Sequence, residues 1–254
     1  MYKIAIISDI HANLPALEAV LSDIDTVFKA DEIFCLGDLT DGAPWVNEVI
    51  DLIRAKNIQT VMGNHDERIA FNHEVYALKK HTLEEQEARF ETIEQTKKVI
   101  SHANRKYLWE LHQHISFKAG GLSFLLVHGS PTSNRTYLYE DHSRESVEEM
   151  FTSTGADVIV CGHTHLSYSR SFYVEGDEKL LLNAGSVGRS KEPIGGKAVY
   201  LQLTINEEGE SLQDKLTVSF RKIDYDVQKT IEAIRNSDTP NFYADFWEKA
   251  IQSL

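Results

Sequence analysis

The sequence predicts an α/β fold in which two mixed β-sheets face each other and helices lie on the outside. In the first half of the chain, short apolar runs rich in β-branched residues alternate with amphipathic helical patterns, which is the order of a parallel sheet. In the second half, successive strand-like segments are joined by short polar turns, and two helical patterns follow them. The 254 residues contain no linker-like or repeated segment, so we expect a single domain over residues 1–254.

The first strands and helices are predicted by the pattern of apolar residues. Five short runs have the length and composition of buried strands, namely residues 2–7, 33–36, 58–62, 122–127 and 157–161. Two amphipathic stripes predict helices between the first three runs, through Leu14, Leu17, Leu21 and Ile24 and through Val46, Val49, Ile50 and Ile53. Asn13 is placed to cap the first helix, Pro15 lies in its first turn, and Pro44 leads into the second.

The rest of the chain divides into further strands, two terminal helices and an insertion. Strand-like segments follow at residues 166–174, 179–185, 197–204 and 215–223. The tail carries two helical patterns, with Val227, Ile231 and Ile234 in the first and Phe246, Trp247 and Ile251 in the second. Residues 67–114 are mostly polar, have helical spacing and separate two of the buried strands, so we expect them to form a helical cap.

Composition bears on where the protein is located and on what it can bind. The apolar runs are far shorter than the roughly 20 residues that span a bilayer, and the amino terminus soon meets polar residues, so we expect a cytoplasmic protein with no membrane partner. Cys35 and Cys161 lie in strand-like runs, which favours two reduced core thiols over a disulfide. The net charge of −13 disfavours a nucleic-acid polymer, whose backbone requires a basic surface, but not a small anionic substrate held at metal ions. The oligomeric state stays open.

Ionisable or amide side chains follow each of the five buried strands. They are Asp9 and His11, Asp38 and Asp41, Asn64 and His65, His128, and His163 with His165. Taken singly, each has an ordinary explanation as a turn residue, a helix cap or a core histidine. Parallel strands end at one edge of a sheet, so these groups would meet there and would repel or stay unsatisfied without a cation. The pattern therefore predicts a centre with two metal ions.

The same groups form ordered motifs that resemble those of the calcineurin-like metallophosphoesterases. The motifs are Asp9-x-His11, Gly37-Asp38-x-x-Asp41, Gly63-Asn64-His65-Asp66, His128 and Gly162-His163-x-His165. The resemblance covers about residues 1–200 and includes "NAGSVG" at 183–188. It implies a four-layer α/β/β/α sandwich of two mixed sheets, with the metals at one edge and the helical cap inserted at about 67–114.

The resemblance also implies a role for each motif residue. Asp9, His11 and His165 would bind one metal, Asn64, His128 and His163 would bind the other, and Asp38 would bridge both, because two carboxylate oxygens can span a metal pair. His65 would protonate the leaving oxygen, and Asp41 would fix its tautomer. A hydroxide between the metals would attack phosphorus in line. Oxygen and nitrogen ligands favour Mn or Fe, with Zn as a further option.

Differences from relatives bear on the substrate. Gly42 and Asp66 stand where the protein Ser/Thr phosphatases of this family have arginine and glutamate, which argues against a phosphoprotein. The chain is more similar to small bacterial phosphodiesterases and to asymmetric diadenosine-tetraphosphate hydrolases. We therefore expect a small phosphorylated substrate, a nucleotide polyphosphate such as diadenosine tetraphosphate that is cleaved to ATP and AMP. The alternatives, in order, are another small phosphodiester, a phosphoprotein, and a non-catalytic scaffold, which would not need His65.

Three side chains near the metal edge are candidates for substrate contacts. Arg135, Tyr137 and Tyr139 lie in the loop that follows His128. An aromatic ring there could stack on a base, and an arginine could pair with a distal phosphate.

Overall fold

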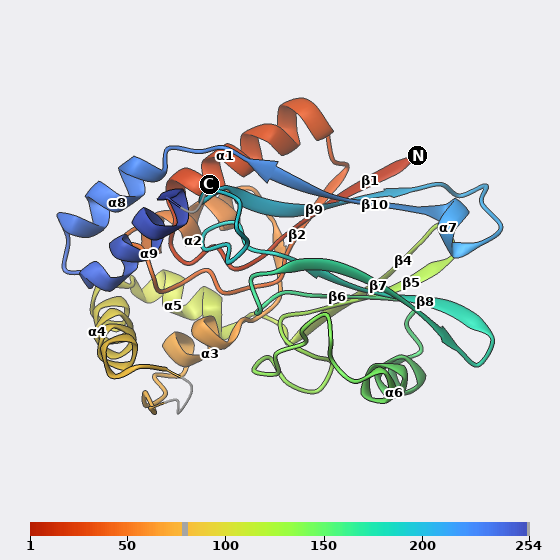
Figure 1. Cartoon of the computed structure of the whole chain (residues 1–254), viewed down its shortest axis with the longest axis horizontal. Coiled ribbons are helices and arrows are strands. Elements are labelled where there is room, and N and C mark those ends of the chain that lie inside the picture. The colour runs from red at the N-terminus through yellow and green to blue at the C-terminus, as the bar shows by residue number, and fades with distance from the viewer. Residues whose placement is uncertain (78–80, 253–254) are drawn as a thin grey trace.

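The strands form two five-stranded sheets that face each other (Figure 1). The computed structural model describes residues 1–77 and 81–252. Residues 78–80, which belong to the expected cap, and 253–254, at the end of the expected domain, lie outside the described residues.

The first sheet joins the two ends of the chain. Its parallel strands are β1 (Tyr2–Ile7), β2 (Glu32–Cys35) and β3 (Gln59–Thr60), and β9 (Ala198–Ile205) and β10 (Leu216–Ile223) extend it antiparallel on the other side of β1. The register pairs Ile7 with Cys35, so β1 and β2 end side by side. The loops that follow these two strands therefore leave the sheet together.

The second sheet has the strand order β4-β5-β6-β8-β7. Its strands are β4 (His114–Ala119), β5 (Leu122–Val127), β6 (Val158–Cys161), β7 (Ser167–Val174) and β8 (Asp177–Ala184). The strands β5, β6 and β8 run parallel, whereas β4 and β7 are antiparallel edge strands. Both sheets are therefore mixed, as predicted.

Helices cover the outer face of each sheet. The helices α1 (Leu14–Asp23), which continues into the π-helical turn η1 (Ile24–Phe28), and α2 (Val46–Ala55) lie on the first sheet, and α6 (Arg144–Thr154) lies on the second (Figure 1). The Asn13 side chain accepts a hydrogen bond from Ala16 N (3.3 Å), which confirms the predicted cap.

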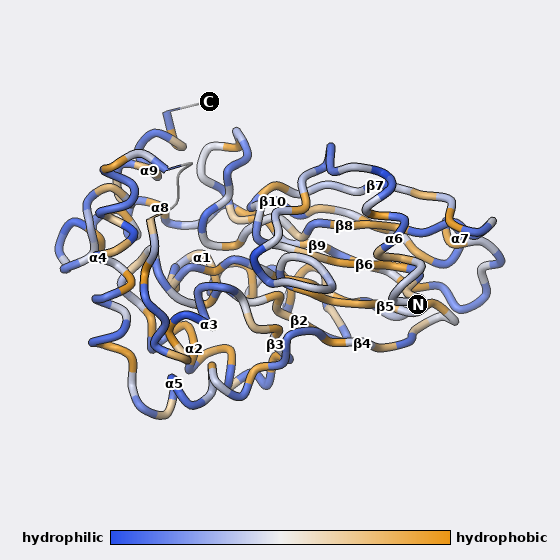
Figure 2. The backbone as a smooth tube through the Cα atoms, turned by 90° about the horizontal axis from the view of Figure 1, so that it is seen from below, coloured by the Kyte–Doolittle hydropathy of each residue, from blue (hydrophilic) through white to orange (hydrophobic). Residues whose placement is uncertain are grey.

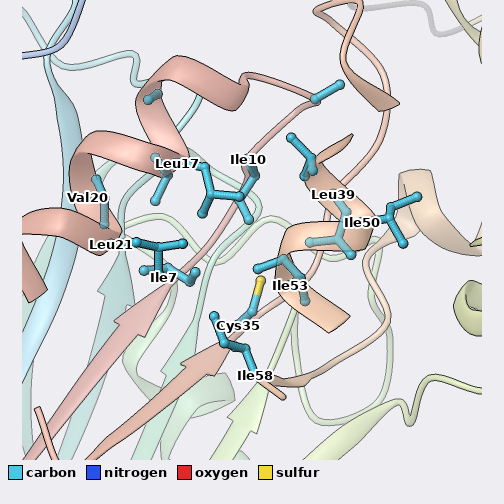
Figure 3. Close-up of a cluster of buried hydrophobic side chains, with 14 of the residues drawn as sticks. Ile7, Ile10, Leu17, Val20, Leu21, Cys35, Leu39, Ile50, Ile53 and Ile58 are labelled. Atoms are coloured by element: carbon cyan, nitrogen blue, oxygen red, sulfur yellow. The ribbon is translucent and has the colours of Figure 1, made fainter. Parts of the chain in front are cut away.

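Three layers of apolar side chains lie between these elements. Side chains alternate along β1, so Ile4 and Ile6 point toward the second sheet and Ala5 and Ile7 toward the helices. The strands are the most hydrophobic segments of the chain (Figure 2), and Ile7 packs with side chains of α1 and α2 (Figure 3). A second layer fills the space between the sheets, and a third lies under α6. The predicted four-layer α/β/β/α sandwich is confirmed.

The segment between β3 and β4 is helical, as expected, but its limits differ from the prediction. It contains α3 (Asn64–Ala70), α4 (Leu83–Val99) and α5 (His102–Trp109), so its first helix begins within the Gly-Asn-His motif. The expected terminal helices are α8 (Val227–Arg235) and α9 (Asn241–Gln252), and both pack with α4 through a small apolar cluster. The division into one domain with a cap stays a prediction.

Several elements differ from the sequence prediction. The strand expected at 58–62 has only two paired residues, and α7 (Leu212–Lys215) takes the start of the strand expected at 215–223. The strand β4 and the helix α6 were not predicted, because β4 has no fully buried residue and α6 buries only two.

The two cysteines lie in buried strands, as the sequence predicted. Cys35 and Cys161 are free and buried, as expected. Among the described residues no helix is both long and apolar enough to cross a membrane.

Candidate metal centre

The loops after the central strands of both sheets meet at one edge of the sandwich. Backbone bonds from Asp9 N to Gly37 O (3.0 Å) and from His11 N to Asp38 O (2.9 Å) join the loops after β1 and β2. Asp9 Oδ2 also accepts a hydrogen bond from His163 N (2.9 Å), which ties the first sheet to the second. Every motif residue predicted from the sequence thus lies in one region.

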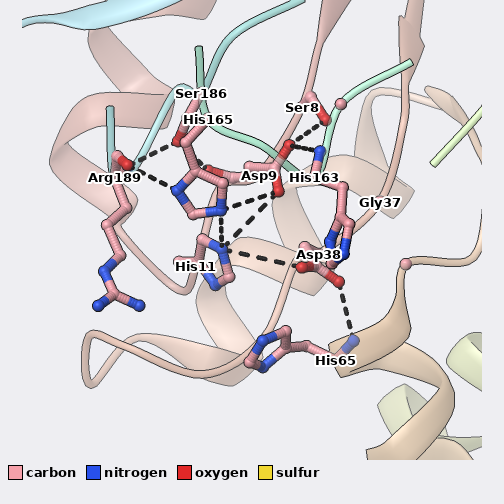
Figure 4. Close-up of polar contacts among 12 residues, drawn as sticks. Ser8, Asp9, His11, Gly37, Asp38, His65, His163, His165, Ser186 and Arg189 are labelled. Carbon is pink, nitrogen blue, oxygen red and sulfur yellow. Dashed lines mark hydrogen bonds and ion pairs between the residues drawn. The ribbon is translucent and has the colours of Figure 1, made fainter. Parts of the chain in front are cut away.

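The first cluster consists of Asp9, His11 and His165, all buried. The Nε2 atoms of the two histidines are 3.1 Å apart, and His165 Nε2 lies 3.2 Å from Asp9 Oδ1 (Figure 4). Backbone carbonyls orient both rings, since His165 Nδ1 donates to Arg189 O (2.7 Å) and His11 Nδ1 lies 3.1 Å from Asp41 O. These outer contacts leave the two Nε2 atoms facing the cluster.

The second cluster consists of Asp38, His128 and His163, with Asn64 beside it. His128 Nδ1 donates to Leu36 O (2.8 Å), so its Nε2 atom faces inward. That atom lies 3.1 Å from Asn64 Oδ1 and 3.2 Å from His163 Nδ1. The two clusters and Asn64 together contain the seven expected ligands, whose division between two metals stays a prediction.

Asp38 lies between the two clusters. Its Oδ2 atom is 3.8 Å from His11 Nε2 in the first cluster and 3.4 Å from His128 Nε2 in the second. Its other oxygen, Oδ1, accepts a hydrogen bond from His65 N (2.9 Å). Asp38 Oδ2 therefore faces both clusters, and the bridging role of Asp38 stays a prediction.

The donor atoms of the clusters fit two metal ions. Asp9 Oδ1 is buried and makes no hydrogen bond within the described part of the chain. Burial opposes a charge on His128, but the Asp38 carboxylate outweighs it and raises the pKa of His128 to about 9. Burial lowers the pKa of His163 to about 3. Packed imidazoles around buried carboxylates are the donor set of Mn, Fe and Zn sites.

His65 and Asp41 form a pair beside the clusters. Asp41 Oδ2 lies 2.6 Å from His65 Nδ1, which places a proton on Nδ1 and leaves Nε2 to face substrate. The His65 ring also meets the His11 ring edge-on, with centroids 5.1 Å apart. This is the arrangement that the proposed acid and its orienting carboxylate require.

The backbone at the centre is unusual. Left-handed φ angles occur at Asp9 (52°), Asp38 (54°), Asp41 (65°), His163 (65°) and His165 (64°). Residues other than glycine adopt this region rarely and at a cost, and such positions concentrate at functional sites. Tertiary hydrogen bonds hold these residues in place, so this feature could not be read from the sequence.

Asp66 has a structural role that sequence reasoning missed. Its carboxylate is fully buried and accepts hydrogen bonds from Leu39 N (2.9 Å) and Gly63 N (3.2 Å). Burial, together with the nearby Asp38 carboxylate, raises the pKa of Asp66 to about 7. Asp66 thus connects the loop that carries Asp38 to the turn that carries Asn64.

A cavity of about 100 Å³ opens over the clusters, and its wall contains residues that the sequence did not single out. They are His81, Glu85, Arg68, Arg89, Arg189, Lys191 and Tyr243. A larger hollow of about 410 Å³ adjoins it, and both are lined by Arg68, Arg89 and Tyr137. Arg189 follows "NAGSVG" directly, and this position was the signal that could have pointed to it. Four of these residues, Arg68, His81, Glu85 and Arg89, belong to residues 67–114, so this segment contributes to the cavity over the clusters.

The three substrate-contact candidates lie in different positions. Tyr137 lines both hollows, and its ring lies over His163 with centroids 3.9 Å apart. Arg135 lines only the outer hollow and forms an ion pair with Glu67 (2.6 Å). Tyr139 stacks on Tyr137, with ring centroids 5.8 Å apart, and lines neither of these two hollows. Tyr137 is therefore the best placed of the three.

Comparison with known proteins gives one family. The profile of the calcineurin-like phosphoesterase superfamily domain matches residues 2–208. An uncharacterized protein of Methanocaldococcus jannaschii is 31% identical over 255 residues, which cover 95% of this chain and 96% of that protein.

Two solved structures share the fold. A metallophosphoesterase from Sphaerobacter thermophilus has a TM-score of 0.73 and 24% identity, covering 98% of this chain and 99% of the other. A hypothetical protein from Pyrococcus horikoshii has a TM-score of 0.78 and 21% identity, covering 97% and 98%. With the profile extending over most of the sequence and two sets of buried ligands in place, the chain belongs to the calcineurin-like phosphoesterase superfamily and is a metal-dependent phosphoester hydrolase.

Proposed function

We propose that the chain hydrolyses a nucleotide polyphosphate such as diadenosine tetraphosphate, asymmetrically, to ATP and AMP. The observation that carries this proposal is the charge around the centre. The whole chain has a net charge of −13, yet Arg68, Arg89, Arg189 and Lys191 all line the cavity over the clusters. Such a local excess of cations attracts a substrate with several phosphates, because guanidinium groups bind phosphate oxygens in pairs.

The ligand residues take the roles that the two clusters suggest. Asp9, His11 and His165 would hold one metal, Asn64, His128 and His163 would hold the other, and Asp38, which lies between the clusters, would be shared by both. Two such ions, Mn or Fe by preference, would supply Lewis-acid chemistry, since they would polarise a phosphoryl oxygen and lower the pKa of water. Backbone groups orient Asp38, His128 and His165 among these side chains.

His65 is the proposed proton donor. Its Nδ1 atom is held by Asp41, so its Nε2 atom is free to give a proton to the leaving oxygen. Tyr137 lines the outer hollow and is the aromatic side chain that we propose to contact the nucleoside. A small nucleotide in a cytoplasmic setting is the partner that we propose, and the outer hollow of about 410 Å³ has the size for one nucleoside.

Product chromatography tests the proposal. Metal-reconstituted protein is incubated with diadenosine tetraphosphate in ¹⁸O-labelled water, and equal amounts of ATP and labelled AMP are expected. The Asp38→Asn variant, purified in parallel, controls for contaminating hydrolases. Two ADP molecules would contradict the asymmetric cleavage. No cleavage beside robust hydrolysis of bis(4-nitrophenyl) phosphate would instead identify a phosphodiesterase acting on another small diester.

A further inference from the structure

Arg189 belongs to the centre through its backbone and faces the cavity with its side chain. Its carbonyl accepts the hydrogen bond from His165 Nδ1 (2.7 Å), and its N–H donates to Ser186 Oγ (2.8 Å), as Figure 4 shows for both groups. The position of the residue is therefore fixed by the same contacts that orient a ligand. The side chain lines the cavity together with Asp38 and His65.

The guanidinium of Arg189 rests on aromatic rings rather than on an acid. Its Cζ atom lies 4.9 Å from the ring centroid of Tyr243 and 5.1 Å from that of Phe246. Its Nε atom is buried and has no hydrogen-bond partner, and Arg189 makes no ion pair among residues 1–77 and 81–252. Aromatic faces hold an arginine without neutralising it. The charge is thus kept for an anion that enters the cavity.

The helix that provides these rings is tied to the loops of the centre. Trp247 Nε1 in α9 donates to the hydroxyl of Tyr225 (2.8 Å), and this hydroxyl also accepts from Asn13 Nδ2 (3.1 Å). Asn13 follows the His11 loop and donates as well to Gly188 O (3.0 Å), next to Arg189. In Figure 1, α9 lies beside α8 and α4 at the end of the sandwich that carries the centre.

We propose that Arg189, positioned by α9, binds a phosphate next to the scissile one and so selects substrates with consecutive phosphates. The family profile ends at residue 208 and α9 lies beyond it, so the rings that position Arg189 come from outside the matched domain. The inference rests on the proposed function for the identity of the substrate. Tyr243 and Phe246 are positioning residues, because they act through Arg189.

Binding measurements separate one phosphate from two. Metal-loaded protein is titrated calorimetrically with imidodiphosphate, whose P–N–P linkage resists hydrolysis, and with inorganic phosphate. The ratio of the two Kd values is compared among wild type, Arg189→Ala, Arg189→Lys and Tyr243→Leu. The control is Arg144→Ala, since this exposed arginine of α6 pairs with Glu148 on its own helix. Metal content is measured for each variant, and any chelation by imidodiphosphate affects all of them alike.

For Arg189→Ala we expect the Kd of imidodiphosphate to rise at least about tenfold more than the Kd of phosphate, because charge-assisted hydrogen bonds to one phosphate are lost. The ratio of the two Kd values in Arg189→Lys should lie between that of Arg189→Ala and that of wild type, since lysine keeps the charge without the planar guanidinium. Tyr243→Leu should shift the ratio in the same direction by a smaller factor, with KM for a polyphosphate rising more than kcat falls. Arg144→Ala should match wild type.

Two results would overturn the inference. An unchanged ratio of Kd values in Arg189→Ala with two metals bound would show that Arg189 does not contact the second phosphate. An unchanged ratio in Tyr243→Leu would show that α9 does not position Arg189. If diadenosine tetraphosphate is not cleaved but the ratio changes as expected, the proposed substrate fails while the Arg189 assignment holds.

Discussion

Replacing Gly63 by alanine should damage the metal centre more than it damages the fold. A Cβ atom at this position would lie 2.2 Å from Asp38 N and 2.2 Å from Asp38 Oδ1. The φ angle of −75° suits alanine, so the effect would come from this contact alone. Relief requires a movement of about 1 Å, because heavy atoms prefer separations near 3.5 Å, and the neighbour that must move carries the bridging carboxylate.

The cost follows from overpacking. Inserting a methyl group into a filled space costs about 1–3 kcal/mol, which for a chain of this size lowers Tm by roughly 2–4 °C per kcal/mol. We therefore expect Gly63→Ala to lower the Tm of the metal-free protein by several degrees. Its affinity for metal should fall more than about tenfold, since a ligand shared by both sites is displaced.

A matched control separates the two effects. Gly155 ends α6 at φ 68°, and a Cβ atom there would meet nothing within 4 Å. Gly155→Ala should lower the free energy of unfolding by a similar amount, about 1–2 kcal/mol, through backbone strain alone. Thermal unfolding is measured on metal-free protein and metal affinity by competition with a chromogenic chelator. If Gly63→Ala binds two metals with wild-type affinity, or if Gly155→Ala loses affinity equally, the reasoning is refuted.

Three further predictions concern the bridge, the acid and a distant ion pair. Asp38→Asn should lose both metals together, because Oδ2 faces both clusters, and metal analysis that still finds two ions per chain would contradict this bridge. His65→Ala should keep its metals but lose turnover on a diester with an alkoxide leaving group by about 10²–10⁴-fold, with a smaller loss on a nitrophenyl diester; equal losses on both would exclude an acid role. Hydrogen bonding from Arg221 lowers the pKa of Asp23 below its ordinary value. The pair therefore stabilises the folded state fully above the unfolded pKa of Asp23, about 3.9, and this contribution is lost as the pH falls through the lower pKa of the folded state. Urea unfolding of metal-free protein should show that the free energy of unfolding falls less between pH 7 and pH 3 in Asp23→Asn than in wild type. An equal fall in both proteins would show that the pair does not contribute.

The sequence alone determined the elements whose signal is local. The apolar runs that became β1, β5 and β6 are buried between layers, so their composition is hydrophobic throughout. Asn13 predicted the start of α1 because capping needs only neighbouring backbone. The ligand residues were also visible, since parallel strands must end at a common edge.

Other elements were hidden because their signal depends on the rest of the fold. β4 is an edge strand that β5 pairs with on one side only, and its six residues are half-buried or exposed. The two residues of β3 are held by pairing with β2, not by a long apolar run. Such elements form because a neighbour completes their hydrogen bonds, which a local pattern does not reveal.

Only the tertiary structure determined how the side chains of the centre are arranged. The sequence placed Asp38 between two metals, but the hydrogen bond from His65 N to Oδ1 determines that Oδ2 faces both clusters. The cations of the cavity come from α3, α4 and the loop after β8, and Tyr243 comes from α9. Each of these residues reads as an ordinary surface or core position in its own segment. Their common role arises because chain folding brings distant segments to one cavity, and sequence spacing carries no record of that distance.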